Sequence, residues 1–462
     1  MGARFALAHQ PGIAAPLSIR RYAVSIETLA ALLGAVVAGL LLMAPLDLGG
    51  ATAGPVLQLD LLVLNMPRAA AAGAALAVVS AALVVALGRR SAWITACGSA
   101  VMLLVDQFWN RGAPTMDSLT TANYIDSMFA GILLGALAVA VFGKPLATAA
   151  FLIGALGSIL VGDQTSLPPA DGQGNPLIQL ASAGTPPVWL LLLTAALLAA
   201  GIMLQQPDPA IEEETTDLAI GTILSALVVI TATVLSTEWF VRHAGTLVQI
   251  GAAIAVTVGA AVLAALLLPG REGTLVLLAV AVANAGSAII AVPRPDWTAP
   301  FPVLALLAGL AAGRARRSPW LALAVTGALA VFAAGTADLA HQYSVIPVLG
   351  VVGTGFAIGC CFGAAVPKGA GSAVVAIAVL IVPCLVVALR GSDFGRVAYS
   401  PRWYRDPTGV VSAMPGWSAL VVTLGCAAGV YLLWRIRPAG AAPAALLAAP
   451  HADEPRKVLP RG

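Results

Sequence analysis

Three aspartates are the side chains best suited to proton chemistry, because each stands at the edge of a long apolar segment. Asp60 opens one segment, Asp106 lies near the end of the next, and Asp126 lies near the start of the following one. Ionisable groups inside a membrane are candidates for ion or proton pathways, and a desolvated carboxylate titrates nearer to neutral pH. The spacing predicts an acidic vestibule whose carboxylates couple or gate transport. Ordinary helix-end carboxylates in headgroup water are the alternative.

One polar residue falls in the middle of an apolar segment. Asn284, in the stretch "VAVANAGSAII", either faces a cavity or packs with its small neighbours against another helix. Convergent polar groups of the kind that bind sugars or ions are sparse elsewhere in the apolar segments. We therefore expect the cargo of any cavity to be a hydrophobic or amphipathic small molecule, with membrane lipids as the surrounding partner.

The composition identifies the elements that must position these residues. The chain has 462 residues, of which 60% are hydrophobic and 10% charged. Soluble domains are about 45–50% apolar and about 25% charged. Apolar runs long enough to cross a bilayer recur along the chain, and the alternating segments of a β-barrel do not. The sequence predicts an all-α polytopic membrane protein.

Signatures of enzymes and bound groups do not emerge. The five cysteines fall in apolar runs without metal-type spacing to histidine, and no phosphate-binding loop or serine elbow is present. We expect no catalytic residue, no metal, no cofactor and no nucleic-acid partner. One enzyme class stays open, the lipid-linked glycosyltransferases with many helices, since acidic residues also occur in the first outer loop.

The distribution of positive charge orients the predicted helices. About fourteen apolar segments lie between residues 23 and 434, although the tenth is short and rich in proline. With the N-terminus in the cytoplasm, the inner loops and the two tails together hold 16 of the 24 Lys and Arg residues, as the positive-inside rule expects. An even number of spans then places both termini in the cytoplasm, which predicts a multi-pass protein of the plasma membrane.

A basic turn occurs twice on the predicted inner side. "GRRSAW" holds Gly88, Arg89 and Arg90, and "RRSPW" later repeats the pattern with Arg316 and Arg317. A glycine permits a tight turn, while arginine and the following tryptophan anchor such a turn at the headgroups. Two copies at corresponding inner turns indicate a duplicated chain. Anchoring alone, without duplication, is the alternative.

These turns carry a resemblance to the fourteen-helix drug/proton antiporter branch of the major facilitator superfamily. Gly88, Arg89 and Arg90 match the end of that family's Gly-x-x-x-Asp-Arg-x-Gly-Arg-Arg signature. The stretch "PLDLGGATAGPVLQLD" resembles the family's first outer loop, and "GILLGA" (131–136) resembles a Gly-x-x-x-Gly motif. The resemblance implies two six-helix bundles with alternating access to a central cavity. Val85 stands where the signature has Asp, and residues 151–162 lack the proline of the antiporter motif.

The expected organisation follows from the segments and the resemblance together. It comprises a cytoplasmic N-terminal tail (1–22), an N-terminal six-helix bundle (23–204), an acidic cytoplasmic linker (205–217), an inserted helix pair (218–268), a C-terminal six-helix bundle (274–434) and a cytoplasmic C-terminal tail (435–462). The outer loop 390–417 mixes Arg, Tyr and Trp, which suits a cap, an interfacial anchor or a surface for a protein partner.

The leading hypothesis is a secondary transporter that exports a hydrophobic or lipidic small molecule, with proton coupling through the aspartates. The departures from the family motifs favour a second hypothesis, a non-transporting membrane scaffold on the same fold. A lipid-linked glycosyltransferase or a flippase of another many-helix family is the third.

Overall fold

The structure is a computed structural model that describes residues 17–43, 56–109, 116–164, 186–204, 220–243, 246–289, 298, 300–339, 343, 345–367, 369–389 and 413–438. All regular secondary structure in these ranges is helical, as predicted. The helices are α1 (Leu17–Met43), α2 (Val56–Leu87), α3 (Arg89–Trp109), α4 (Met116–Val141), α5 (Pro145–Gln164), α7 (Val188–Leu204), α8 (Ile220–His243), α9 (Leu247–Leu267), α10 (Gly273–Ser287), α11 (Pro300–Arg316), α12 (Pro319–Gly335), α13 (Val345–Ala364), α14 (Ala370–Ile381), α15 (Leu385–Leu389) and α16 (Met414–Ile436).

Ten segments among the described residues are long and apolar enough to cross a membrane. The helices α7, α10 and α12 are apolar but shorter. Every predicted apolar segment coincides with one of the observed helices, with α14 and α15 together forming a single segment, Ala370–Leu389. The chain is therefore a multi-pass helical membrane protein. The number of helices that cross the bilayer and the placement of the termini in the cytoplasm stay predictions.

Several helices extend beyond their predicted apolar limits. The first begins at Leu17 rather than near residue 23, and the second begins at Val56, the earlier of the two starting points that the sequence allows for it. Leucine, arginine and glutamine are good helix formers, so the hydrogen-bonded backbone continues where the apolar pattern stops. Conversely, α10 ends at Ser287, short of the predicted end near residue 292.

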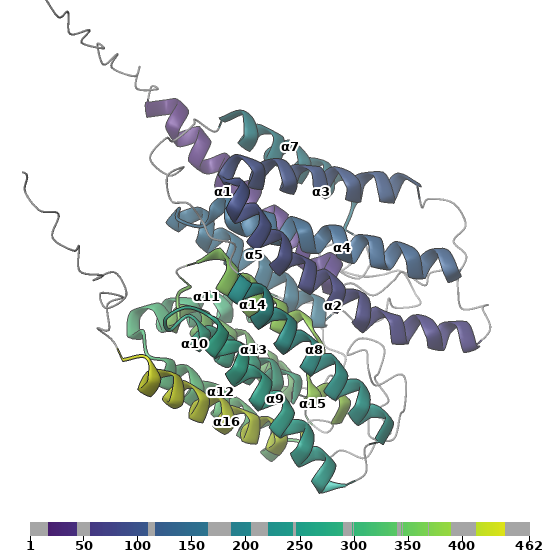
Figure 1. Ribbon diagram of the computed structural model, residues 1–462, viewed down its shortest axis with the longest axis vertical. Helices are drawn as coiled ribbons and strands as arrows, with labels where there is room; N and C mark the ends of the chain where they lie inside the picture. The colour runs from purple at the N-terminus through teal and green to yellow at the C-terminus, as the bar shows by residue number, and fades with distance from the viewer. Residues whose placement is uncertain are drawn as a thin grey trace, which may run out of the picture.

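The helices form two sets that lie side by side in Figure 1. In the first set, α2 packs along α4, α1 along α5 and α7, and α3 against α4 and α7. In the second, α11 packs along α13, α10 along α14 and α16, and α12 against α13 and α16. Contacts between the sets run from α2 to α14 and from α5 to α11. The pair α8 and α9 adjoins both sets, since α8 contacts α2 and α14 while α9 contacts α10 and α16.

Glycines allow the closest helix pairs to approach backbone to backbone. A Cβ atom added at Gly131 of α4 would lie 2.0 Å from the carbonyl oxygen of Gly73 on α2, and Gly135 makes an equally close approach. In the second set, a Cβ atom at Gly309 of α11 would lie 2.2 Å from the carbonyl oxygen of Phe356 on α13. Small residues at helix interfaces allow close packing within membranes. The "GILLGA" stretch thus forms part of a helix interface.

The segment that ends at Leu389 is not one continuous helix. It is broken between α14 and α15 at Pro383, whose nitrogen has no hydrogen to donate. The Thr237 hydroxyl donates to the Pro383 carbonyl at 3.5 Å, and the Cys384 thiol donates to the Ala283 carbonyl at 3.6 Å. Irregular backbone at membrane depth is tolerated where protein surrounds it. Within the segment Ala370–Leu389, 94% of the apolar stretch is buried.

One arginine clamps the turn between α9 and α10 to the end of α16. The Arg437 guanidinium donates hydrogen bonds to three backbone carbonyls at the end of α9 and in the turn, those of Leu266, Leu268 and Gly270. Nε of Arg271 donates a hydrogen bond to the Arg437 carbonyl at 2.9 Å, and the Arg271 guanidinium lies 4.7 Å from the Trp434 ring centroid. These contacts lie at the terminal end of the bundle, meaning the end that holds the start of α1 and the end of α16 (Figure 1).

Candidate functional site

Two of the three predicted aspartates meet at the end of the bundle opposite the terminal end. The carboxyl groups of Asp106 on α3 and Asp126 on α4 lie within hydrogen-bonding reach of each other, and both residues are half-buried. An ionised carboxylate has no hydrogen to donate, so such a bond exists only when one of the two carboxyl groups is protonated. The geometry therefore suits a shared proton. Asp60 lies on α2, and its side chain falls outside the described part of the structure.

The residue after Asp106 links α3 to the start of α7. Nε2 of Gln107 donates to the Pro186 carbonyl, just before α7, at 2.7 Å. The other amide atom, Oε1, is buried and has no hydrogen-bond partner among the described residues. Sequence analysis did not single out Gln107, although its place beside Asp106 near the end of an apolar segment was a usable signal.

The first basic turn, between α2 and α3, is held against the end of α4. Gly88 has φ +87°, in the left-handed region that favours glycine. Nε of Arg89 donates to the Ala140 carbonyl in the last turn of α4 at 2.8 Å, where a cation also complements the helix dipole. Arg90 is exposed. Trp93 is only 1% exposed and packs on Gly201 of α7, so its expected role as a headgroup anchor is replaced by internal packing.

The second basic turn differs from the first in its backbone. The left-handed residue is Arg317 itself, with φ 46°, and Ser318 caps the start of α12 through a bond from the Leu321 nitrogen. Arg316 is exposed, and Trp320 is exposed with its ring edge-to-face against Trp434 at 6.2 Å. The two turns connect consecutive helices at the terminal end, but their matching letters do not occupy matching backbone positions.

Two ion pairs join helices that are distant in sequence. The Lys144 ammonium binds the Glu27 carboxylate, which is buried on α1. At the opposite end, Arg68 of α2 makes a two-point contact with Glu238 of α8, at 2.8 and 3.1 Å. Neither pair was predictable from the sequence, since hydropathy carries no information on which helices are neighbours.

Asn284 lies in the buried centre of the second set. It is 1% exposed, and its Nδ2 donates to the Val280 carbonyl of its own helix at 2.8 Å. Its Oδ1 is buried and unpartnered among the described residues. Packing against other helices accounts for its burial, while the unpaired oxygen is a polar group that a cavity ligand or water would satisfy.

The remaining expectations have limited structural coverage. Residues 390–412 of the predicted partner loop, residues 205–217 of the acidic linker, and most of both tails lie outside the described residues. Within the described ranges, no three His, Cys, Asp or Glu side chains gather closely enough to hold a metal ion.

Comparison with known proteins adds no relative. No protein-family model matches the chain, and no curated protein matches its sequence. The class of the molecule, a multi-pass membrane protein built of helices, therefore rests on the fold. Its resemblance to the major facilitator superfamily rests on the quoted motifs alone and stays a prediction.

Proposed function

We propose that this protein is a secondary active transporter of the major facilitator type, which exports a hydrophobic or lipidic small molecule across the plasma membrane. Two six-helix bundles would alternate between inward and outward openings around a central cavity. Both termini would lie in the cytoplasm, so the terminal end of the bundle would be the inner end.

The observation that carries this proposal is the repeated order of helix packing. Most contacts among α1, α2, α3, α4, α5 and α7 recur among α10, α11, α12, α13, α14 and α16, although α10 also packs against α12 whereas α1 and α3 share no comparable contact. Parallel repeats related by an axis along the membrane normal are typical of transporters of this type. The pair α8 and α9 falls between the two series in the chain, which supports its description as an inserted pair.

The contact between Asp106 and Asp126 supports proton coupling. A pair that shares one proton can release it when α3 and α4 move relative to each other, because separated carboxyl groups ionise more easily. A cycle that alternates between the two arrangements would exchange a proton for cargo. The alkyl-rich helix surfaces around the bundle suit a cargo that reaches the protein from the lipid phase.

The test is flux in proteoliposomes that contain the full chain, with the fluorescent amphiphile ethidium and an NBD-labelled phospholipid as separate cargoes. We expect a pH gradient to drive the flux of at least one cargo and an ionophore that collapses the gradient to stop it. The double variant Asp106→Asn, Asp126→Asn should lose the pH dependence. Asp338→Asn, which changes an exposed carboxylate outside the helices, is the matched control.

Two results would count against the proposal. Unchanged flux and pH dependence in the double variant would remove the coupling role of the aspartates. No flux of either cargo, together with a partner that copurifies in stoichiometric amounts, would favour the membrane scaffold.

A further inference from the structure

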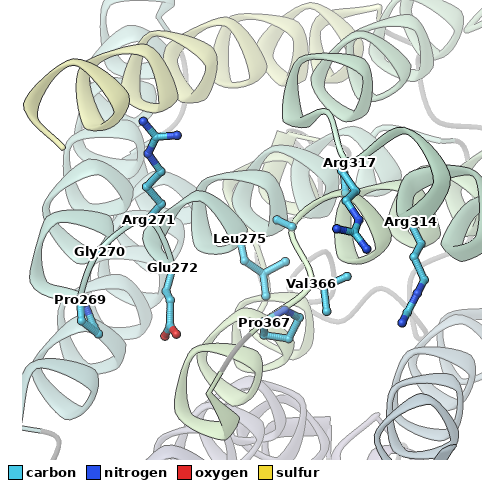
Figure 2. Close-up of a pocket in the computed structure, with 11 residues that line it drawn as sticks. Pro269, Gly270, Arg271, Glu272, Leu275, Arg314, Arg317, Val366 and Pro367 are labelled. Atoms are coloured by element: carbon cyan, nitrogen blue, oxygen red, sulfur yellow. The ribbon is translucent and has the colours of Figure 1, made fainter. Parts of the chain in front are cut away.

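A pocket of about 660 Å³ opens at the terminal end of the second set. Three chain segments line it: the turn between α9 and α10 with the first turn of α10, the end of α11, and the turn between α13 and α14 (Figure 2). Its size falls in the range of small-molecule sites, roughly 300–1,000 Å³. Neither the aspartate pair nor the packing repeat assigns it a role.

Two arginines of this pocket have no partner among the described residues. Arg314 and Arg317 line it, and Figure 2 shows their side chains extending in the same direction. Neither guanidinium has a hydrogen bond, ion pair or ring contact with any described residue. Arg271, the third lining arginine, is committed elsewhere, since it is bound to the Arg437 carbonyl and stacked on Trp434. Two guanidinium groups without a partner among the described residues therefore line the same pocket.

Glu272, the acidic residue among the described lining residues, does not neutralise them. The Glu272 carboxylate forms no ion pair with Arg314 or Arg317 among the described residues. Its oxygens lie 3.6 and 3.7 Å from the position of a Cβ atom at Gly369, the residue that caps the start of α14. A carboxylate at a helix N-terminus is stabilised by the exposed amides and the helix dipole. Glu272 is thus directed toward α14, and the pocket keeps a positive wall.

The backbone at Arg317 is a second sign of a functional residue. A side chain with φ 46° is strained, at a cost of about 1 kcal/mol or more, whereas the corresponding bend in the first basic turn uses Gly88. The chain keeps an arginine where glycine would relieve strain. Backbone strain at a single residue is typical of binding sites, where the function of that side chain outweighs the stability that the strain costs.

The rest of the wall is apolar. Pro269, Leu275, Val366 and Pro367 line the pocket together with two alanines. A pair of guanidiniums matches the oxygens of a phosphate group, and an apolar wall matches hydrocarbon. We propose that this pocket binds the phosphate group of an anionic amphiphile, through Arg314 and Arg317. This proposal requires no transport, so binding and flux can succeed or fail separately.

The test is isothermal titration calorimetry on the purified full-length protein in detergent. The probes are dihexanoyl phosphatidic acid, dihexanoylglycerol with the same chains but no phosphate, and inorganic phosphate. We expect the phosphatidic acid to bind and the uncharged lipid not to bind. Arg314→Gln and Arg317→Gly should each weaken binding roughly tenfold or more, because each removes charge-assisted hydrogen bonds.

The variants separate binding from folding. Arg317→Gly removes the guanidinium while relieving backbone strain, so its melting temperature should stay equal or rise. Arg314→Gln leaves the turn unchanged, and Arg316→Gln, which alters an exposed arginine that does not line the pocket, should bind normally.

Equal affinity for inorganic phosphate, with the same losses in both variants, would support the anion site and assign it to a soluble phosphate compound. Wild-type binding by Arg314→Gln and Arg317→Gly would overturn the proposal. So would equal binding of dihexanoylglycerol, an equal loss in Arg316→Gln, or no binding of any probe.

Discussion

The contact between α2 and α4 makes a quantitative prediction about one glycine. In Gly131→Ala, the new Cβ atom would lie 2.0 Å from the Gly73 carbonyl oxygen, whereas real Cβ contacts stay beyond 3.0 Å. The helices would have to separate by about 1 Å, and no flexible side chain can absorb the clash because the opposing atom is backbone. Overpacking of this kind costs about 1–3 kcal/mol, offset by about 1 kcal/mol from the better helix propensity of alanine.

We expect a net loss of about 2 kcal/mol in the free energy of unfolding for Gly131→Ala, since the clash belongs at the upper end of that range. The assay is titration with sodium dodecyl sulfate from a mild detergent, followed by tryptophan fluorescence. Gly98→Ala is the matched control, because Gly98 lies within α3 and an added Cβ atom there meets nothing within 4 Å. That variant should unfold like the wild type or resist unfolding slightly better. If Gly131→Ala behaves like Gly98→Ala, the close approach of α2 and α4 is wrong.

Three further predictions concern the joints at the terminal end. Lys144→Met should lose about 1–3 kcal/mol in the same titration, because the buried Glu27 carboxylate loses its half-exposed partner, and adding Glu27→Gln should restore most of that loss. Equal losses in the single and double variants would contradict the ion pair. Arg437→Lys should lose about 1–2 kcal/mol and speed proteolysis between α9 and α10, since one ammonium cannot replace a forked guanidinium; unchanged cleavage would argue against the clamp. Quenching of tryptophan fluorescence by brominated detergent should fall in Trp320→Phe but not in Trp93→Phe, because Trp320 is exposed whereas Trp93 is buried. The reverse order would refute the placement of these two residues.

The helices were predictable because the bilayer imposes a simple rule on length and polarity. A helix that satisfies its own backbone hydrogen bonds and presents an apolar surface is required at each crossing, so hydropathy alone located the segments. The rule says nothing of where a helix stops outside the apolar region. The first helix therefore begins at Leu17, earlier than its apolar pattern suggests.

The site was predictable only in part. Asp106 and Asp126 stand on consecutive apolar segments joined by a short loop, which made their meeting a reasonable expectation from the sequence. The pairing of Glu27 with Lys144 depends on α1 lying beside the turn after α4, and that is a property of tertiary packing. No residue pattern reveals it without a known neighbour for each helix.

The two basic turns have similar sequences but different structural roles. Trp93 is buried against α7, whereas Trp320 lies on the surface beside Trp434. The sequence repeat was read as two equivalent anchors, but the positive φ falls on Gly88 in one turn and on Arg317 in the other. Short motifs fix residue types and leave the backbone register to local packing.

The helical pair α8 and α9 has a mechanical consequence. One of its helices is fastened to α2 through Arg68 and Glu238, while the other lies against α10 and α16 in the opposite set (Figure 1). The hairpin of α8 and α9 thus contacts both helix sets and bridges the boundary between them. Any motion of one helix set relative to the other must bend this hairpin or slide α8 along α9. The stiffness of the hairpin would then limit the separation of the two sets and supply the force that returns them.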